Sequence, residues 1–243
     1  MKLPLLKYKE SRVPIESIEL KDFNLTSLNN ELVLKEVSQE FEAGKAYRIQ
    51  GALGDCSELL KALAFIHNQV EGEILVNSQN ALDFSFEEFH PLRMNISYTF
   101  DYGGLLNNRS LKENIALPLQ YHDELEMSEI DEVVESYLSL FKILEFKDLR
   151  PAMTPGFVRK LGCIIRSLII QPEVLIMDGP TASLDKERSE ILVNYVSEKF
   201  HDGSIKMIFF STSYEGSFQT WEAESFEISS GKLLRLSSQE LAV

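Results

Sequence analysis

A buried strand that ends in an acidic residue is the first feature of the sequence that could carry chemistry. The apolar run from Val174 to Met177 is followed by Asp178 and then by Gly179. A carboxylate at the end of such a strand can hold Mg²⁺ beside a phosphate group, and a carboxylate one residue later could activate water. The sequence has a residue for the first role and none for the second. The alternative is that Asp178 only caps the turn before Pro180.

The segment 51–58 reads Gly-Ala-Leu-Gly-Asp-Cys-Ser-Glu and partly matches a phosphate-binding loop. That loop has the pattern G-x-x-x-x-G-K-[ST], and its backbone N–H groups and lysine surround phosphate. Aligned on the helix that follows, the loop is one residue short, with Ser57 as the magnesium hydroxyl and Cys56 in place of lysine. No alignment restores the lysine, a loss of about 2–5 kcal/mol, and Asp55 and Glu58 add negative charge near any phosphate. The glycines of this degenerate loop are Gly51 and Gly54.

The order of the expected elements would bring these two segments to one edge of a sheet. Hydrophobic patterns predict strands over 18–23, 32–41, 46–50, 72–76, 174–177 and 206–210, and a closing hairpin at 230–231. They predict helices over 58–67, from about 128 to 144 with a capping box of Ser128 and Asp131, after 159, and over 186–200. We therefore expect an α/β fold. It has a P-loop (RecA-like) core, an antiparallel β lobe near the N-terminus and a helical lobe over about 102–165.

Composition restricts the class of protein and its partners. The 243 residues are 44% hydrophobic and contain no linker or repeat, which predicts a single domain over 1–243. The net charge of −14 argues against nucleic acid or an anionic lipid surface as a direct partner, because both favour clusters of Lys and Arg. Cys56 and Cys163 lack metal-ligand spacing, so we expect reduced thiols in the cytosol and no metal site. No apolar run reaches the roughly 20 residues of a membrane span.

Over essentially the whole chain, this order of elements resembles the nucleotide-binding (ATPase) subunit of an ABC transporter. The resemblance rests on the strand before Asp178, on the Pro-Thr-Ala-Ser-Leu-Asp that ends at Asp185, and on the Phe-Asp-Tyr-Gly-Gly-Leu-Leu that ends at Leu106. The Tyr-Gly-Gly-Leu-Leu and the Val-Arg-Lys at 158–160 look most like the ATPases of Mla/Mce-type lipid transport systems. The family as a whole would use ATP and magnesium.

Against the resembled family, the sequence departs at nearly every position that handles ATP. The glutamine that senses the metal and the permease corresponds to Asp101, the catalytic glutamate to Gly179, and the switch histidine to Thr212. No aromatic residue lies between Leu25 and Leu34 to stack on adenine. These departures predict that ATP binds poorly, if at all.

The family's signature L-S-G-G-Q/M, which closes over the γ-phosphate in the opposite subunit, departs as well. Pro155 removes a hydroxyl and an amide donor, and Phe157 places a ring where bare backbone must approach phosphate. The corresponding residues are Thr154, Pro155, Gly156, Phe157 and Val158.

Taken together, the departures predict a catalytically inactive subunit, a pseudo-ATPase with no cofactor, which supports lipid transport from the cytoplasmic face of the inner membrane. The alternative is a subunit of a heteromeric ABC ATPase that still supports ATP-driven transport by completing a partner's site. A third, weaker hypothesis is a free-standing regulatory module.

The resemblance also implies two protein partners. One is an integral membrane permease, whose cytoplasmic helix would dock on the segment Tyr102, Gly103, Gly104, Leu105 and Leu106. The other is a second subunit of the same type, with a homodimer modestly favoured. The dimer contact would be the loop Ala182, Ser183, Leu184 and Asp185.

Overall fold

The protein is described by a computed structural model that covers residues 12–67, 69–101, 104–121, 125–211 and 222–237. Among these residues, six strands form a sheet in the order β10-β9-β3-β8-β7-β6, and the neighbours from β9 to β6 are all parallel. The strands are β3 (Lys45–Gln50), β6 (Ile96–Thr99), β7 (Val174–Met177), β8 (Met207–Ser211), β9 (Ala223–Ser229) and β10 (Lys232–Arg235).

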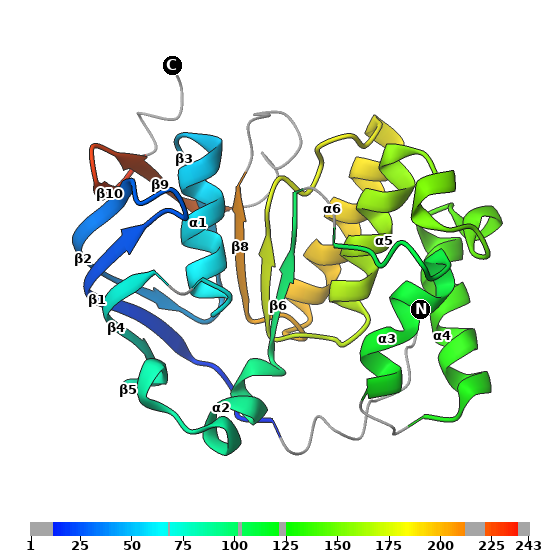
Figure 1. Ribbon diagram of the computed structural model, residues 1–243, viewed down its shortest axis with the longest axis horizontal. Helices are drawn as coiled ribbons and strands as arrows, with labels where there is room; N and C mark the ends of the chain where they lie inside the picture. Colours follow the sequence, from blue (N-terminus) through cyan, green and yellow to red (C-terminus); the bar gives the residue numbers. More distant parts are fainter. Residues whose placement is uncertain (1–11, 68, 102–103, 122–124, 212–221, 238–243) are drawn as a thin grey trace.

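A second, antiparallel sheet forms the lobe that contains the N-terminal strands. Its order is β2-β1-β4-β5 over the described residues. Its strands are β1 (Ser17–Thr26), β2 (Leu32–Glu42), β4 (Val70–Val76) and β5 (Gln79–Asn80). Figure 1 shows this sheet on the left, with α1 (Leu53–Leu63) between it and the parallel sheet. The apolar face of α1, which includes Leu59, Leu60 and Leu63, joins the two sheets in one hydrophobic core.

Except for α2 (Phe86–Arg93), whose Leu92 belongs to the core around α1, the remaining helices lie on the other side of the parallel sheet (Figure 1). They share a second core with one face of β7 and β8, to which Leu175, Met177 and Phe210 belong. The helices are α2 (Phe86–Arg93), α3 (Leu111–Tyr121), α4 (Met127–Leu140), α5 (Gly156–Leu168) and α6 (Lys186–His201). Of these, α2 lies apart, at the foot of the antiparallel lobe. The structure thus has the predicted α/β fold with an antiparallel lobe and a helical lobe.

Two of the predicted helix boundaries are wrong. α1 covers 53–63 and not 58–67, because the glycine loop leads directly into the helix and Phe65 takes a left-handed φ of 56° that stops it. α4 begins at Met127, and its capping box is formed by Glu126 and Glu129 in place of Ser128 and Asp131. The carboxylate of Glu129 accepts the amide of Glu126 at 2.9 Å, so an acidic pair does the work assigned to serine and aspartate.

Candidate functional site

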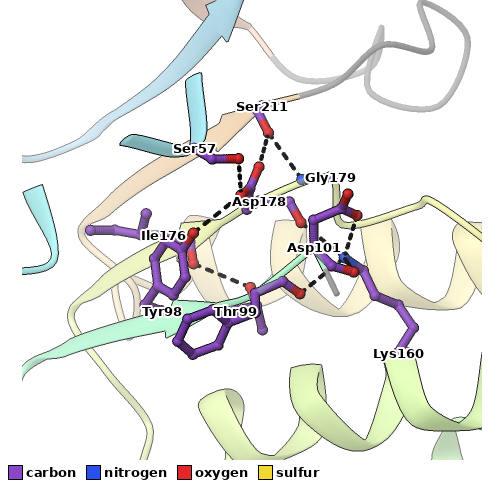
Figure 2. Close-up of polar contacts among 10 residues, drawn as sticks. Ser57, Tyr98, Thr99, Asp101, Lys160, Ile176, Asp178, Gly179 and Ser211 are labelled. Atoms are coloured by element: carbon purple, nitrogen blue, oxygen red, sulfur yellow. Dashed lines mark hydrogen bonds and ion pairs between the residues drawn. The ribbon is translucent and has the colours of Figure 1, made fainter. Parts of the chain in front are cut away.

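Asp178 lies at the centre of a polar network at the carboxyl end of the parallel sheet (Figure 2). Its side chain accepts hydrogen bonds from Ser57 Oγ at 2.5 Å, Ser211 Oγ at 2.7 Å and Tyr98 Oη at 3.1 Å. The residue is only 5% exposed, so these three hydroxyls replace the water that the carboxylate loses on folding. The contacts come from α1, β8 and β6. Asp178 therefore does more than cap the turn before Pro180.

Strand order explains why these groups meet. β3, β6, β7 and β8 run parallel, so their carboxyl ends lie at the same edge, and the chain leaves β3 directly into the loop before α1. Gly51 in this loop has a φ of 137°, and a Cβ there would lie 2.8 Å from the carbonyl oxygen of Ile228. Only glycine fits this turn.

The loop before α1 and the first turns of this helix give the site backbone donors and a hydroxyl but no cation. The first amides of a helix have no partner within the helix, and the cap residue Ala52 has no side chain that could accept them. Ser57 faces Asp178, as in the alignment in which Cys56 replaces lysine. Burial, together with the charges of Asp178 and Asp55, raises the pKa of the Cys56 thiol to about 12. Cys56 is therefore neutral at physiological pH.

Glu58, the last residue of the segment 51–58, contacts side chains within the subunit. Glu58 lies 3.0 Å from Lys61 Nζ, and its second oxygen lies 2.5 Å from Nε2 of His67, which is buried. Glu58 is therefore paired inside the subunit with Lys61 and faces His67, which reduces the negative charge that it adds beside the phosphate site. Asp55 remains in the first turn of α1, half-buried.

Lys160 brings a buried ammonium group to the same edge from α5. Its Nζ donates to the carbonyl oxygens of Asp178 at 2.9 Å, Asp101 at 3.1 Å and Phe100 at 3.2 Å. It also lies 3.3 Å from Oδ1 of Asp101. Burial lowers the pKa of Lys160, and the charge of Asp101 opposes that shift. In the sequence, Lys160 stands out only as the last residue of the Val-Arg-Lys motif, and no pattern predicts its place at this site. The same holds for Tyr98 and Ser211.

Gly179 and Asp101 lie against each other. Gly179 has a φ of 50°, and a Cβ at this residue would lie 2.7 Å from Oδ1 of Asp101. The Gly179 amide donates to Ser211 Oγ at 3.0 Å. A larger side chain at 179 would thus meet both backbone strain and the carboxylate of Asp101.

The residues aligned with the family signature are held by contacts within the chain. Thr154 donates its hydroxyl to the carbonyl of Pro151 at 2.9 Å, and Val158 is fully buried. The guanidinium of Arg188 lies 4.3 Å from the ring centroid of Phe157, a cation–π contact with α6. The residues exposed at the start of α5 are Pro155 and Gly156.

The loop aligned with the dimer contact precedes α6. Ala182 and Ser183 are exposed, Leu184 is half-buried, and Asp185 caps α6 by accepting the Arg188 amide at 2.8 Å. Asp185 therefore has a role inside the subunit as a helix cap.

The segment predicted to contact the permease is partly described. The carbonyl of Gly104 accepts a hydrogen bond from Arg166, Leu105 packs on the helical core, and Leu106 is 46% exposed. Gly104, Leu105 and Asp101 line a cavity of about 430 Å³ that Lys160 also borders. Tyr102 and Gly103, like the predicted switch residue Thr212, lie outside the described residues.

The site has the donor set of a magnesium and phosphate site. Mg²⁺ prefers oxygen ligands and is usually held by one or two carboxylates together with substrate phosphates, rather than by a full protein cage. The hydroxyl of Ser57 and the carboxylate of Asp178 supply such oxygens. Over the described parts of the chain, no group of three or more His, Cys, Asp and Glu side chains could hold a metal alone. Within the same residues, no helix is long and apolar enough to cross a membrane.

A sequence profile of the ABC transporter family matches residues 34–182, more than half of the chain. The chain therefore belongs to the ABC transporter family. It is 32% identical over 181 residues to the methionine import ATP-binding protein MetN 1 of Bacillus cereus, which covers 73% of this chain and 52% of that protein. It is 25% identical over 173 residues to MetN of Legionella pneumophila, with 71% and 50% covered. The chain spans about half the length of the curated relatives it matches.

Solved structures support the fold. The dimeric post-hydrolysis state of the ATP-binding cassette MJ0796, bound to ADP and Pi, matches with a TM-score of 0.79 and 21% identity. The match covers 89% of this chain and 96% of that chain. At this identity the likeness shows the fold alone, and it confirms the predicted ABC-type P-loop fold.

These comparisons leave one prediction without support and contradict another. The relatives carry names from methionine import, not from Mla/Mce-type lipid transport. They are also named ATP-binding proteins. The prediction that the chain is a pseudo-ATPase and no enzyme is therefore wrong. In physical terms, the missing lysine was given too much weight, because Ser57 and Asp178 still form the oxygen pair that a metal needs.

Proposed function

We propose that this chain is the ATP-binding and ATP-hydrolysing subunit of an ABC transporter, acting on the cytoplasmic face of a membrane. The observation that carries the proposal is the contact of Ser57 with Asp178 at the edge where the loop before α1 meets β7. Family membership explains why these two segments meet, and the donor set explains what they would hold.

Each part of the site has a distinct task in this proposal. Ser57 and Asp178 supply oxygen ligands to magnesium, which offsets the charge of the phosphates. The first amides of α1 would donate to the phosphates, which the positive end of the helix dipole would also favour. Because Cys56 is neutral, we expect weaker binding than in a loop with lysine, by about 2–5 kcal/mol before compensation by magnesium.

The test is calorimetric titration of ATP with and without magnesium. Ser57→Ala should weaken ATP binding in the presence of magnesium by about tenfold, which is about 1.4 kcal/mol, and should change little without the metal. Ser139→Ala, at an exposed position of α4, is the matched control and should behave as wild type. Absence of saturable binding by the wild-type chain at millimolar ATP would refute the proposal.

A membrane permease is the proposed partner, and Leu106 is the described residue best placed to meet it. The side chain is 46% exposed, and its chain neighbours Leu105 and Asn107 line the cavity, whereas Leu105 also packs against the helical core. Leu106→Glu should therefore release the chain from membranes while its melting temperature stays within a few degrees. Leu28→Glu, at a 72% exposed site in the other lobe, should remain bound. Unchanged co-sedimentation of the Leu106 variant would contradict this contact.

The transported cargo is a separate part of the proposal, because two similarities of the chain suggest two different chemical classes of cargo. The matched relatives are named for methionine import, and the match to MetN 1 of Bacillus cereus covers 73% of this chain. The likeness to lipid transport systems rests on two short motifs, the Tyr-Gly-Gly-Leu-Leu that ends at Leu106 and the Val-Arg-Lys at 158–160. We therefore place a small polar cargo of the amino-acid class first and lipid second. Transport assays with the cognate permease in vesicles, using labelled methionine and labelled phospholipid, would separate the two.

For assembly we propose two copies of the chain, joined in part by the loop 182–185. The exposed Ala182 and Ser183 are available for such a contact. The heteromeric alternative places each altered loop opposite an intact partner segment. Mass measurement of the purified transporter decides between them, since one copy beside a different ATP-loaded subunit would refute the homodimer.

A further inference from the structure

We propose that Asp101 is the general base of ATP hydrolysis, in place of a side chain at residue 179. This inference rests on the proposed function. In the reaction, Asp101 accepts a proton from water while the water oxygen bonds to the terminal phosphorus. The bond from that phosphorus to the bridging oxygen breaks, ADP leaves, and Asp101 passes its proton on to the released phosphate.

The geometry at Gly179 carries the inference. A Cβ at this residue would lie 2.7 Å from Oδ1 and 3.1 Å from Cγ of Asp101. The carboxyl carbon of a glutamate lies two bonds beyond its Cβ, so the carboxylate of Asp101 fills the space that a glutamate at 179 would enter. The missing side chain at Gly179, after β7, is thus matched by the carboxylate of Asp101, after β6, which occupies the same space (Figure 2).

Asp101 is also held in position and open to water. Lys160 binds its carbonyl at 3.1 Å and lies 3.3 Å from its carboxylate, while it binds the carbonyl of Asp178 at 2.9 Å. One ammonium group therefore fixes the base relative to the residue proposed to bind magnesium. The side chain of Asp101 is 50% exposed and borders a cavity of about 430 Å³, so water can reach it. Lys160 is in this sense a positioning residue.

The simpler alternative is that Asp101 is only an ion-pair partner of Lys160. Asp101→Asn separates the two roles, because the amide oxygen can still accept from Lys160 but the side chain can no longer accept a proton from water. A carboxylate moved by one methylene, in Asp101→Glu, should restore part of the base function.

The decisive experiment measures ATP binding and hydrolysis separately on the full chain. Asp101→Asn should bind ATP and magnesium within about threefold of wild type and hydrolyse it about 10²–10⁴-fold more slowly. With hydrolysis slowed, ATP-loaded chain should accumulate in gel filtration. Asp101→Glu should hydrolyse faster than Asp101→Asn. Asp148→Asn makes the same charge change at an exposed residue and should match wild type.

A second measurement needs no nucleotide. Gly179→Ala should lower the Tm more in the wild-type background than in Asp101→Ala, because the new Cβ meets the Asp101 carboxylate only in the first. Equal losses of Tm would overturn the placement, and hydrolysis by Asp101→Asn within threefold of wild type would overturn the base. Failure of the wild-type chain to bind ATP would instead refute the proposed function and this inference with it.

Discussion

The carboxyl end of β7 and the start of α5 are both expected to handle phosphate in an ABC subunit, and here they differ. At β7, the buried Asp178 accepts hydrogen bonds from three hydroxyls, and with one of them, that of Ser57, it forms a pair of oxygens suited to a metal. At α5, Thr154 and Phe157 are committed to contacts inside the subunit. The oxygen donors lie where a buried carboxylate needs hydrogen-bond partners in any case, and the departures at α5 lie where the family has bare backbone. An altered motif in one half of a site is thus poor grounds for inferring that the other half is lost.

Lys160 connects these two regions, and its removal should have the largest effect on stability. Lys160→Met keeps the aliphatic bulk but leaves the carbonyls of Phe100, Asp101 and Asp178 without a donor. An unsatisfied buried acceptor costs about 1–3 kcal/mol. Because the exposed Asp101 can relax, we expect the free energy of unfolding to fall by about 3 kcal/mol in total. Urea unfolding measures this loss.

The control for that prediction is Lys186→Met, whose side chain is 92% exposed. It should change the free energy of unfolding by less than about 0.5 kcal/mol. Equal stability of the two variants would show that Lys160 does not hold β6, β7 and α5 together, and would make the two regions independent.

A smaller effect is expected at the start of α5 itself. Phe157→Leu keeps an apolar side chain but removes the ring over which Arg188 lies. A partly exposed cation–π contact contributes about 0.5–1 kcal/mol, so the free energy of unfolding should fall by about that amount. Thermal melting without nucleotide checks it. A loss above 2 kcal/mol would mean that the packing of Phe157 against the helical core and Phe146 contributes more than its contact with Arg188.

Sequence patterns predicted the fold because it depends on hydrophobic runs, and the strands at 174–177 and 46–50 fall almost where they were expected. They also placed Asp178 and Ser57 in one site. They could not predict that Glu58 turns to His67, or that Lys160 reaches across to Asp178, because such contacts depend on side-chain directions between elements far apart in the chain. The pseudo-ATPase prediction failed because it rested on the number of departures from the family pattern. That number does not reveal that Ser57 and Asp178 still meet in the folded chain.

The last and smallest effect concerns the thiol that stands in the place of lysine. A raised thiol pKa reduces the fraction of reactive thiolate, so Cys56 should be protected from alkylation in the folded chain. With a pKa of about 12 against an ordinary 9.0, the folded chain at pH 8 should contain roughly a thousandfold less thiolate than the unfolded chain. In stability, the same shift acts only above pH 9. There the folded state holds a proton that the unfolded state has lost, and stability falls as pH rises.

Iodoacetamide labelling followed by mass spectrometry measures this protection. Cys163→Ala leaves Cys56 as the single thiol of the chain, so the labelling rate can be assigned to one site. The rate at pH 8 in buffer, compared with that in urea, should be at least a hundredfold lower, since the buried thiol is also shielded sterically. Rapid labelling of the folded chain would place Cys56 in open solvent. It would then be free to contact a bound phosphate, and the β7 side of the site would be as altered as the start of α5.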